Sequence, residues 1–128
     1  MKQSTQEWVE RAEEDWGVAV REARARKIPR YNLACNLAQQ CAEKYLKARL
    51  EEAGISFKKT HELENLLNQV LTAEPTWSVF QNDAAYLSTF AVDYRYPGVH
   101  ATRVMARDAI KSCRKLRQVV RTSLGLPS

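Results

Sequence analysis

The stretch NLACNLAQQCAEKYLKARLEEAG, residues 32–54, decides the fold class of this chain. Apolar side chains recur there at every fourth position, with a second apolar set beside them: Leu33, Leu37, Cys41 and Tyr45, then Ala34, Ala38, Ala42 and Leu46. This repeat predicts a helix from about Asn32 to Ala53 with one broad buried face. Gly54 is expected to end the helix, because glycine adopts the left-handed backbone of a helix stop without steric cost.

Four further helices are predicted on either side of this stretch. They run from a capping-box pattern at Ser4 and Glu7 to about Lys27, from His61 after an N-cap at Thr60 to about Leu71, from Pro75 through Ala91, and from about Val99 to Leu124. No window shows the sustained alternation of a strand. The sequence therefore predicts an all-α protein, organised as a single domain over residues 1–128 with a core of about residues 4–124.

Composition restricts the compartment and the chemistry. No run reaches the roughly 18–20 apolar residues that cross a bilayer, and the N-terminus lacks the apolar core of a signal peptide. We therefore expect a cytoplasmic protein that makes no membrane contact. Cys35, Cys41 and Cys113 lack metal-ligand spacing and are expected to be buried thiols. No metal site and no cofactor are predicted.

The net charge of +5 is concentrated near the C-terminus, where residues 99–128 carry seven Lys and Arg against one acidic residue. On a helical wheel five arginines align with two lysines beside them: Arg103, Arg107, Arg114, Arg117 and Arg121, with Lys111 and Lys115. Two interpretations remain open. The stripe contacts a polyanion or an acidic partner, or it is a solvated face that forms ion pairs with acidic residues of the first helix.

The sharpest interruption of the helical pattern is the corner Arg95-Tyr96-Pro97-Gly98-Val99-His100. It places a guanidinium and an imidazole at the start of the basic helix. Such a pair can bind phosphate or cleave RNA, or it can be a helix–helix corner alone. Tyr94 and Tyr96 flank Arg95 and are candidates for stacking on a base.

Several separate motifs of the chain resemble the HEPN family of small helical domains. They are Asn36 to Ala48 of the second helix, Lys59-Thr60-His61-Glu62-Leu63, the corner from Asp93 to Gly98, and Trp8, Ala12, Asp15 and Trp16 upstream. They occur in the family's order over roughly residues 6–122. The resemblance implies an antiparallel, up-and-down four-helix bundle with a short additional helix, usually assembled as a homodimer.

The resemblance also implies two kinds of function. Many members are metal-independent ribonuclease toxins that use an Arg-x4–6-His motif, which Arg95 and His100 satisfy in this chain. Others are linked to nucleotide binding, and many are encoded beside a minimal nucleotidyltransferase in toxin–antitoxin-type pairs. Nuclease members commonly carry a polar residue after the arginine, where this chain has Tyr96, and the Arg-Tyr-Pro-Gly corner is similar to a branch that often lacks the histidine.

The predicted function is therefore the binding of nucleotide or RNA phosphate through Arg95 and the basic last helix. Candidate phosphate ligands are Arg95, Arg103, Arg107, Lys44 and Lys47. Contacts within the second helix explain the two lysines equally well. A catalytic role of His100 with Arg95, as general acid–base and phosphate ligand, is the alternative. A protein-interaction module is a further alternative, and His61 is expected to be structural.

Overall fold

The computed structural model describes residues 1–57, 59–91 and 96–128, and every element within these ranges is helical. The elements are α1 (Gln3–Arg24), α2 (Tyr31–Ala53), α3 (Leu63–Val70), the 3-10 helix η1 (Pro75–Phe80), α4 (Gln81–Ser88) and α5 (Arg103–Ser123). The all-α prediction is confirmed.

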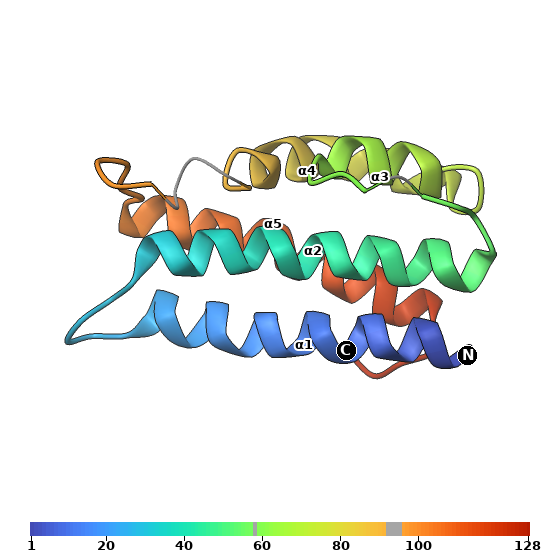
Figure 1. Cartoon of the computed structure of the whole chain (residues 1–128), viewed down its shortest axis with the longest axis horizontal. Helices are drawn as coiled ribbons and strands as arrows, with labels where there is room; N and C mark the ends of the chain where they lie inside the picture. The colour runs from blue at the N-terminus through green and yellow to red at the C-terminus, as the bar shows by residue number, and fades with distance from the viewer. Residues whose placement is uncertain (58, 92–95) are drawn as a thin grey trace.

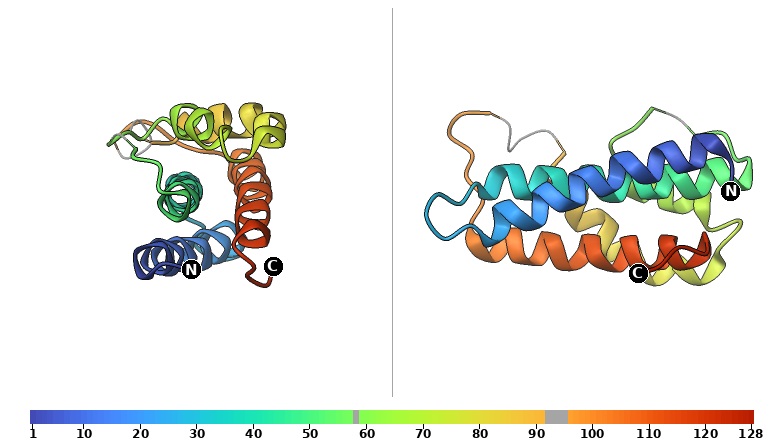
Figure 2. Two further views of the ribbon diagram at one scale, coloured as in Figure 1. Left: turned by 90° about the vertical axis from the view of Figure 1, so that its right-hand side faces the viewer. Right: turned by 90° about the horizontal axis from the view of Figure 1, so that it is seen from below.

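The fold is an antiparallel four-helix bundle with α3 as the short additional helix. Along the chain α1, α2, α4 and α5 alternate in direction, and α3 lies beside α4 (Figure 1). Seen end-on, α2 lies between α1 and the α3–α4 pair, and α5 closes the side (Figure 2). The end of α1 and the start of α5 therefore meet at the same end of the bundle.

Helix α2 is the centre of the core, as its apolar face predicts. Its side chains Ala34, Ala38, Cys41, Tyr45 and Leu46 are fully buried. Small residues on this face let the neighbouring backbones approach closely, and leucines of α3, α4 and α5 fill the space around them. The helix ends as predicted, because Gly54 has φ 71° and the N–H of Ile55 donates to Leu50 O at 3.0 Å.

The two predicted N-caps, Ser4 and Thr60, are wrong. In the first case a residue of another helix binds the hydroxyl, and in the second a residue of another helix binds the first N–H of α3. Helix α1 begins at Gln3, and Ser4 Oγ donates to Glu51 Oε1 at 2.8 Å instead of capping its own helix. Helix α3 begins at Leu63, later than predicted, and the N–H of Leu63 donates to Ser88 Oγ at 2.9 Å. The hydroxyl of Thr60 accepts from the N–H of Glu62 in a local turn.

Three other predicted boundaries also move. Helix α1 ends at Arg24, where Ala25 turns extended, and not near Lys27. The single helix predicted from Pro75 is a 3-10 turn followed by α4. The last helix starts at Arg103 and not at Val99, because Thr102 caps it by accepting from the N–H of Met105 at 3.1 Å.

The three cysteines are buried free thiols, as expected. Cys35 and Cys41 of α2 and Cys113 of α5 all lie within the core. Burial raises the pKa of Cys35 to about 12, because a thiolate loses its hydration there. The thiols therefore act as small apolar packing groups between helices.

Candidate functional site: a basic groove beside His100

The chain enters α5 through a tight turn. The N–H of Val99 donates to Tyr96 O at 3.4 Å, and Gly98 has φ 90°. Proline in the second position and a positive φ in the third are the features of a type II turn, which favours glycine there. The Pro97-Gly98 pair thus fixes how the backbone reaches His100.

Asn32, in the first turn of α2, holds the segment that carries His100. Its Nδ2 donates to Val99 O at 2.8 Å, and its Oδ1 accepts from the N–H of Ala101 at 2.5 Å. One amide side chain therefore satisfies backbone groups on both sides of His100. The imidazole is presented from a fixed backbone although it lies outside any helix.

His100 is exposed at the edge of a recess of about 420 Å³. The other residues that line this His100 recess come from the α1–α2 loop, the start of α2 and Ala101: Pro29, Arg30, Tyr31, Asn32 and Leu33. Tyr96 is also exposed, at 61%. Two predicted site residues, Arg95 and Tyr94, lie outside the described residues.

The two lysines of α2 that were candidate phosphate ligands are in ion pairs within the bundle. Lys44 Nζ lies 2.5 Å from Asp15 Oδ2 of α1. Lys47 is buried, with its Nζ 2.9 Å from Glu43 Oε2 and 5.4 Å from the ring centroid of Trp8. The predicted alternative, contacts within the second helix, therefore accounts for Lys47, whereas Lys44 pairs with a residue of α1.

His61 is tied to the same buried carboxylate. Its Nδ1 lies 3.0 Å from Glu43 Oε1, and its backbone oxygen accepts from Gln39 Nε2 at 3.1 Å. Burial alone would raise the pKa of Glu43, but hydrogen bonds from Lys47, His61 and Gln39 outweigh it and lower the pKa. His61 thus anchors the segment before α3 to α2, which is the structural role expected for it.

The basic stripe of α5 divides into two halves with different partners. In the C-terminal half, Arg117 donates from Nε and Nη2 to the two oxygens of Glu13 at 2.8 and 2.7 Å, and Arg121 lies 3.7 Å from the same carboxylate. Tyr45 also donates to Glu13. The predicted alternative, ion pairs with acidic residues of the first helix, is confirmed for these two arginines.

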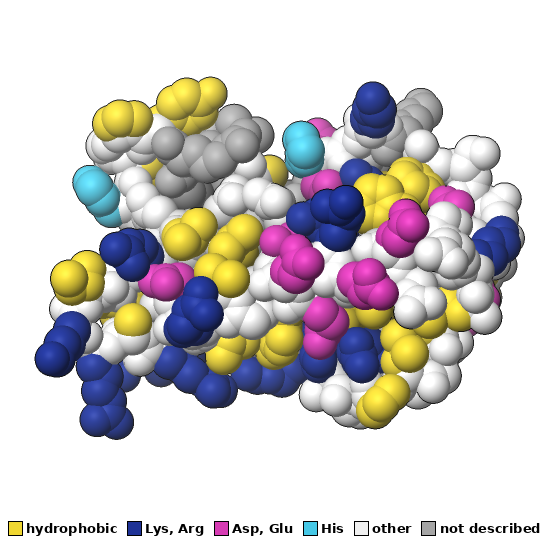
Figure 3. Space-filling view, turned by 60° about the horizontal axis from the view of Figure 1, so that its bottom comes forward, with side chains coloured by type: hydrophobic (Ala, Val, Ile, Leu, Met, Phe, Trp, Pro, Cys, Tyr) yellow, Lys and Arg dark blue, Asp and Glu magenta, His cyan; other side chains and the backbone are white. Residues whose placement is uncertain are grey.

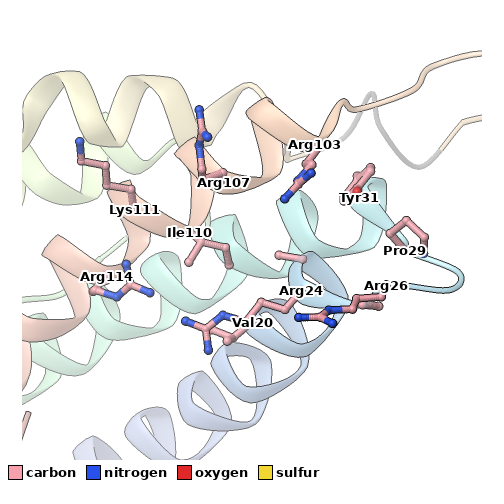
Figure 4. A pocket seen from close by; sticks show the side chains of 12 residues that line it. Val20, Arg24, Arg26, Pro29, Tyr31, Arg103, Arg107, Ile110, Lys111 and Arg114 are labelled. Atoms are coloured by element: carbon pink, nitrogen blue, oxygen red, sulfur yellow. The ribbon is translucent and has the colours of Figure 1, made fainter.

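The N-terminal half of the stripe faces a groove between the end of α1 and the start of α5, with a volume of about 850 Å³. Six cationic side chains line this basic groove: Arg24, Arg26, Arg103, Arg107, Lys111 and Arg114. Arg24 and Arg26 lie on the wall opposite Arg103, while Arg107 and Lys111 extend from the outer edge of α5 (Figure 4).

The groove has an apolar floor and no acidic lining residue. Val20 and Ala23 of α1 and Ile110 of α5 form the floor. None of the six cations forms an ion pair with an acidic residue of the described ranges. Lys and Arg side chains gather along one edge of the molecule, whereas acidic groups cluster over the middle of the same face (Figure 3). The groove is therefore a surface of uncompensated positive charge.

Arg114 is held in place by an aromatic ring. Its guanidinium carbon lies 5.5 Å from the ring centroid of Trp16, and that of Arg117 lies 5.2 Å from the same ring. Stacking on an indole keeps the charge of a guanidinium while it restricts the side chain. Trp16 thus links the ion-paired half of α5 to the half that lines the groove.

The basic groove and the His100 recess share a wall. Pro29 and Tyr31 line both of them. Tyr31 is half-buried at the first position of α2, and it lies on the side of the groove where Arg103 lies (Figure 4). The exposed imidazole of His100 therefore adjoins the end of the groove at which α5 begins.

Sequence reasoning placed Arg103 and Arg107 in the site but missed Arg24, Arg26 and Tyr31. The run from Arg24 to Arg30 holds four cations in seven residues, which is a signal that the sequence does carry. Its relation to α5 depends on how the two helices cross, and no pattern within one helix reports that.

The described residues hold neither a cluster of metal ligands nor a membrane-spanning helix. Within residues 1–57, 59–91 and 96–128, no three His, Cys, Asp or Glu side chains are grouped as metal ligands. In the same ranges, every helix is too short or too polar to cross a membrane.

Comparison with known families agrees with this architecture. A model of the HEPN domain matches residues 5–123. No curated protein sequence matches the chain.

Two solved structures share the fold. The protein TT1696 from Thermus thermophilus has a TM-score of 0.82 at 23% identity, covering 94% of this chain and 98% of that one. "ST0689, an archaeal HEPN homologue" has a TM-score of 0.72 at 29% identity, covering 96% and 98%. The similarity therefore extends over nearly the whole length of all three chains.

Proposed function

The chain belongs to the HEPN domain family, and on that premise we propose that it binds the phosphates of RNA or a nucleotide at the N-terminal half of α5. Arg103 and Arg107 are the predicted ligands that line the basic groove, with Arg95 assigned to the same function from the sequence. The observation that carries the proposal is that six cationic side chains and no acidic one line a single groove.

Charge is the physical reason for this choice. Cations held close together repel one another, and a polyanion relieves that repulsion while it releases its own counterions. The C-terminal half of α5 does not offer such a site, because Arg117 and Arg121 are already in ion pairs with Glu13.

The test is the salt dependence of binding to a labelled ten-nucleotide uridine RNA. For single strands, the logarithm of affinity falls with the logarithm of salt concentration with a slope of about −0.7 per phosphate contacted. The double variant Arg103→Ala/Arg107→Ala should weaken binding and make this slope shallower by about 1.4.

The matched control, Arg11→Ala/Lys115→Ala, removes the same charge at two positions outside the groove and should leave the slope unchanged. Absence of binding at low salt, or equal effects of the two double variants, overturns the proposal.

A metal-independent ribonuclease is the second candidate function, and the exposed position of His100 beside the groove favours it. In this reaction the imidazole takes the proton of a ribose 2′-hydroxyl, whose oxygen attacks phosphorus. The bond to the 5′-oxygen breaks, a proton is delivered to that oxygen, and a 2′,3′-cyclic phosphate remains. Arg95 is the residue proposed to stabilise the charge on the phosphate oxygens.

Cleavage of a broad RNA pool in EDTA tests this candidate. The variant His100→Ala should lose cleavage and retain RNA binding, whereas His61→Ala should cleave as the wild type does. Equal cleavage or equal inertness of wild type and His100→Ala removes the ribonuclease proposal and leaves the binding proposal intact.

The proposal includes a cytoplasmic homodimer. Four large apolar side chains lie exposed at the end of the bundle that carries His100: Ile28 at 70%, Val104 at 53%, Tyr96 at 61% and Leu33 at 40%. A second copy that covers them removes apolar surface from water. Sedimentation at micromolar concentration should show a dimer, and Leu33→Glu/Val104→Glu should yield a folded monomer. A wild-type monomer under these conditions overturns this part.

A minimal nucleotidyltransferase is the proposed protein partner, in a toxin–antitoxin-type pair. Such a partner requires an acidic face to match the basic groove. Co-purification with the product of the neighbouring gene should succeed and identify it as a nucleotidyltransferase, and Arg107→Glu/Arg114→Glu should abolish the complex. A complex that survives this charge reversal contradicts docking at the groove and favours a separate interaction surface.

A further inference from the structure

Beyond phosphate binding as such, the geometry points to one continuous track for a single strand of nucleic acid. We propose that the strand lies along the basic groove, stacks a base on Tyr31 and reaches the His100 recess. This inference rests on the proposed function and deepens it, because it names the ligand class and assigns roles to Arg24, Arg26 and Tyr31.

The length of the cationic row indicates several phosphates and not one. Arg103, Arg107, Lys111 and Arg114 lie within 12 residues of α5, and the first and last are about 16 Å apart along the axis at 1.5 Å per residue. Neighbouring members are separated by about 6 Å or less along the axis. Successive phosphates of an extended strand are spaced on the same scale, so the row matches a strand of about four phosphates.

Cationic side chains also line the opposite wall of the groove. Arg24 and Arg26 lie across the groove from α5 (Figure 4). Arg24 belongs to the last turn of α1, and Arg26 follows two residues later in the loop. A strand in the groove is therefore contacted from two sides.

The floor selects an unpaired strand. Val20, Ala23 and Ile110 present apolar surface between the two cationic walls. Base faces can pack on apolar and aromatic side chains only when the bases are free of a duplex stack. A duplex would offer the floor only its charged backbone, which apolar groups do not solvate.

Tyr31 lies where the groove meets the His100 recess. It lines both the groove and the recess, so a ligand that passes from Arg103 to His100 passes this ring. Its position at the start of α2, next to the Asn32 side chain that holds Val99 and Ala101, fixes it relative to His100. A stacked base at Tyr31 sets the distance between the strand and the imidazole.

Binding of uridine oligonucleotides of one to ten residues tests the track at constant low salt. Affinity should rise steeply up to about five nucleotides and little beyond, because the cationic row then has no further phosphate to contact. Single-stranded RNA and DNA of ten nucleotides should both bind, and a duplex of the same length should bind at least about tenfold more weakly.

Two sets of variants locate the track. Tyr31→Leu, which keeps the apolar bulk but removes the ring, should weaken decanucleotide binding at least about fivefold, and Tyr31→Phe should not. Neither should change the binding of inorganic tripolyphosphate. Arg24→Ala/Arg26→Ala should weaken decanucleotide binding more than the control pair Arg11→Ala/Arg21→Ala, which lies on α1 outside the groove.

The outcomes separate this inference from the function on which it rests. If a nucleoside triphosphate or the duplex binds as tightly as the decanucleotide, the single-strand track is wrong while phosphate binding stands. The same holds if Tyr31→Leu and the Arg24/Arg26 pair bind as the wild type does. If no phosphate ligand binds at low salt, the proposed function itself fails.

Discussion

The side chain of Asn32 is hydrogen-bonded to the backbone on both sides of His100, donating to Val99 O at 2.8 Å and accepting from the N–H of Ala101 at 2.5 Å. This contact ties the first turn of α2 to the segment that precedes α5. The position of the His100 backbone therefore depends on the packing of α2 and not on the loop alone. The sequence predicts a helix from Val99, but the backbone of Val99 and Ala101 is hydrogen-bonded to Asn32 instead.

Removal of the Asn32 amide should loosen His100. Asn32→Ala leaves two partly buried backbone groups without their partner and should lower the free energy of unfolding by about 1–3 kcal/mol. Urea denaturation measures this loss, and the ¹⁵N relaxation of the His100 amide should report increased motion. Asn82→Ala, on the exposed face of α4, is the control and should change neither quantity.

The Glu13–Arg117 pair should make stability fall in acid. Burial alone would raise the pKa of Glu13, but hydrogen bonds from Arg117 and Tyr45 and the charges of Arg117 and Arg121 lower it below its ordinary value of 4.5. A carboxylate with a lowered folded-state pKa stabilises the fold above its unfolded-state pKa. That contribution is lost as the pH falls through the folded-state value.

Urea denaturation between pH 7 and pH 3 measures this dependence. The free energy of unfolding should decline below about pH 4.5 in the wild type, and less steeply in Glu13→Gln. At pH 7, Glu13→Gln should be less stable by about 1–3 kcal/mol, because Arg117 loses its charged partner. Parallel pH profiles of the two proteins contradict the assignment.

The two halves of α5 should respond differently to the same substitution. Arg103→Ala should reduce the salt dependence of RNA binding and leave the melting temperature within about 2 °C, because its guanidinium is exposed. Arg117→Ala should lower the melting temperature by several degrees, because it removes the ion pair with Glu13. It should leave the salt slope unchanged, because the Arg117 guanidinium is bound to Glu13 and does not contact RNA. Equal salt slopes for the two variants would contradict the division of the stripe.

Two glycines should respond in opposite ways to alanine. Gly98 has φ 90° in the turn before His100, so Gly98→Ala should destabilise the protein by about 1 kcal/mol through backbone strain. Gly17 lies within α1, and an added Cβ there meets nothing within 4 Å. Gly17→Ala should therefore stabilise the protein by about 0.5–1 kcal/mol, because alanine loses less backbone entropy in a helix. Thermal denaturation measures both.

Local sequence was most informative for α2. The apolar repeat from Leu33 to Leu46 and the stop at Gly54 involve neighbours within a few turns, so periodicity predicted both the helix and its C-terminal end. Helix N-termini were predicted less well. Ser4 and Thr60 have the residue types of N-caps, but Glu51 binds one and Ser88 fixes the helix start near the other.

The candidate site was predictable only along single elements. The wheel aligned Arg103 and Arg107 with Arg117 and Arg121, yet Glu13 of α1 forms ion pairs with the second two and not with the first two. The sequence carries no signal for this difference, because the distance from a guanidinium to a carboxylate 104 residues away depends on the packing of α1 against α5. The same packing brings Arg24 and Arg26 to the groove.

The sequence by itself therefore determined the helical class, the central buried helix, the family and the cationic character of the last helix, since each follows from contacts or charges close together in the chain. Only the tertiary structure decided which of those cations remain uncompensated, and that Tyr31 and His100 lie at the end of their groove. These relations join the end of α1, the start of α2 and the start of α5, and they exist only once the bundle has packed.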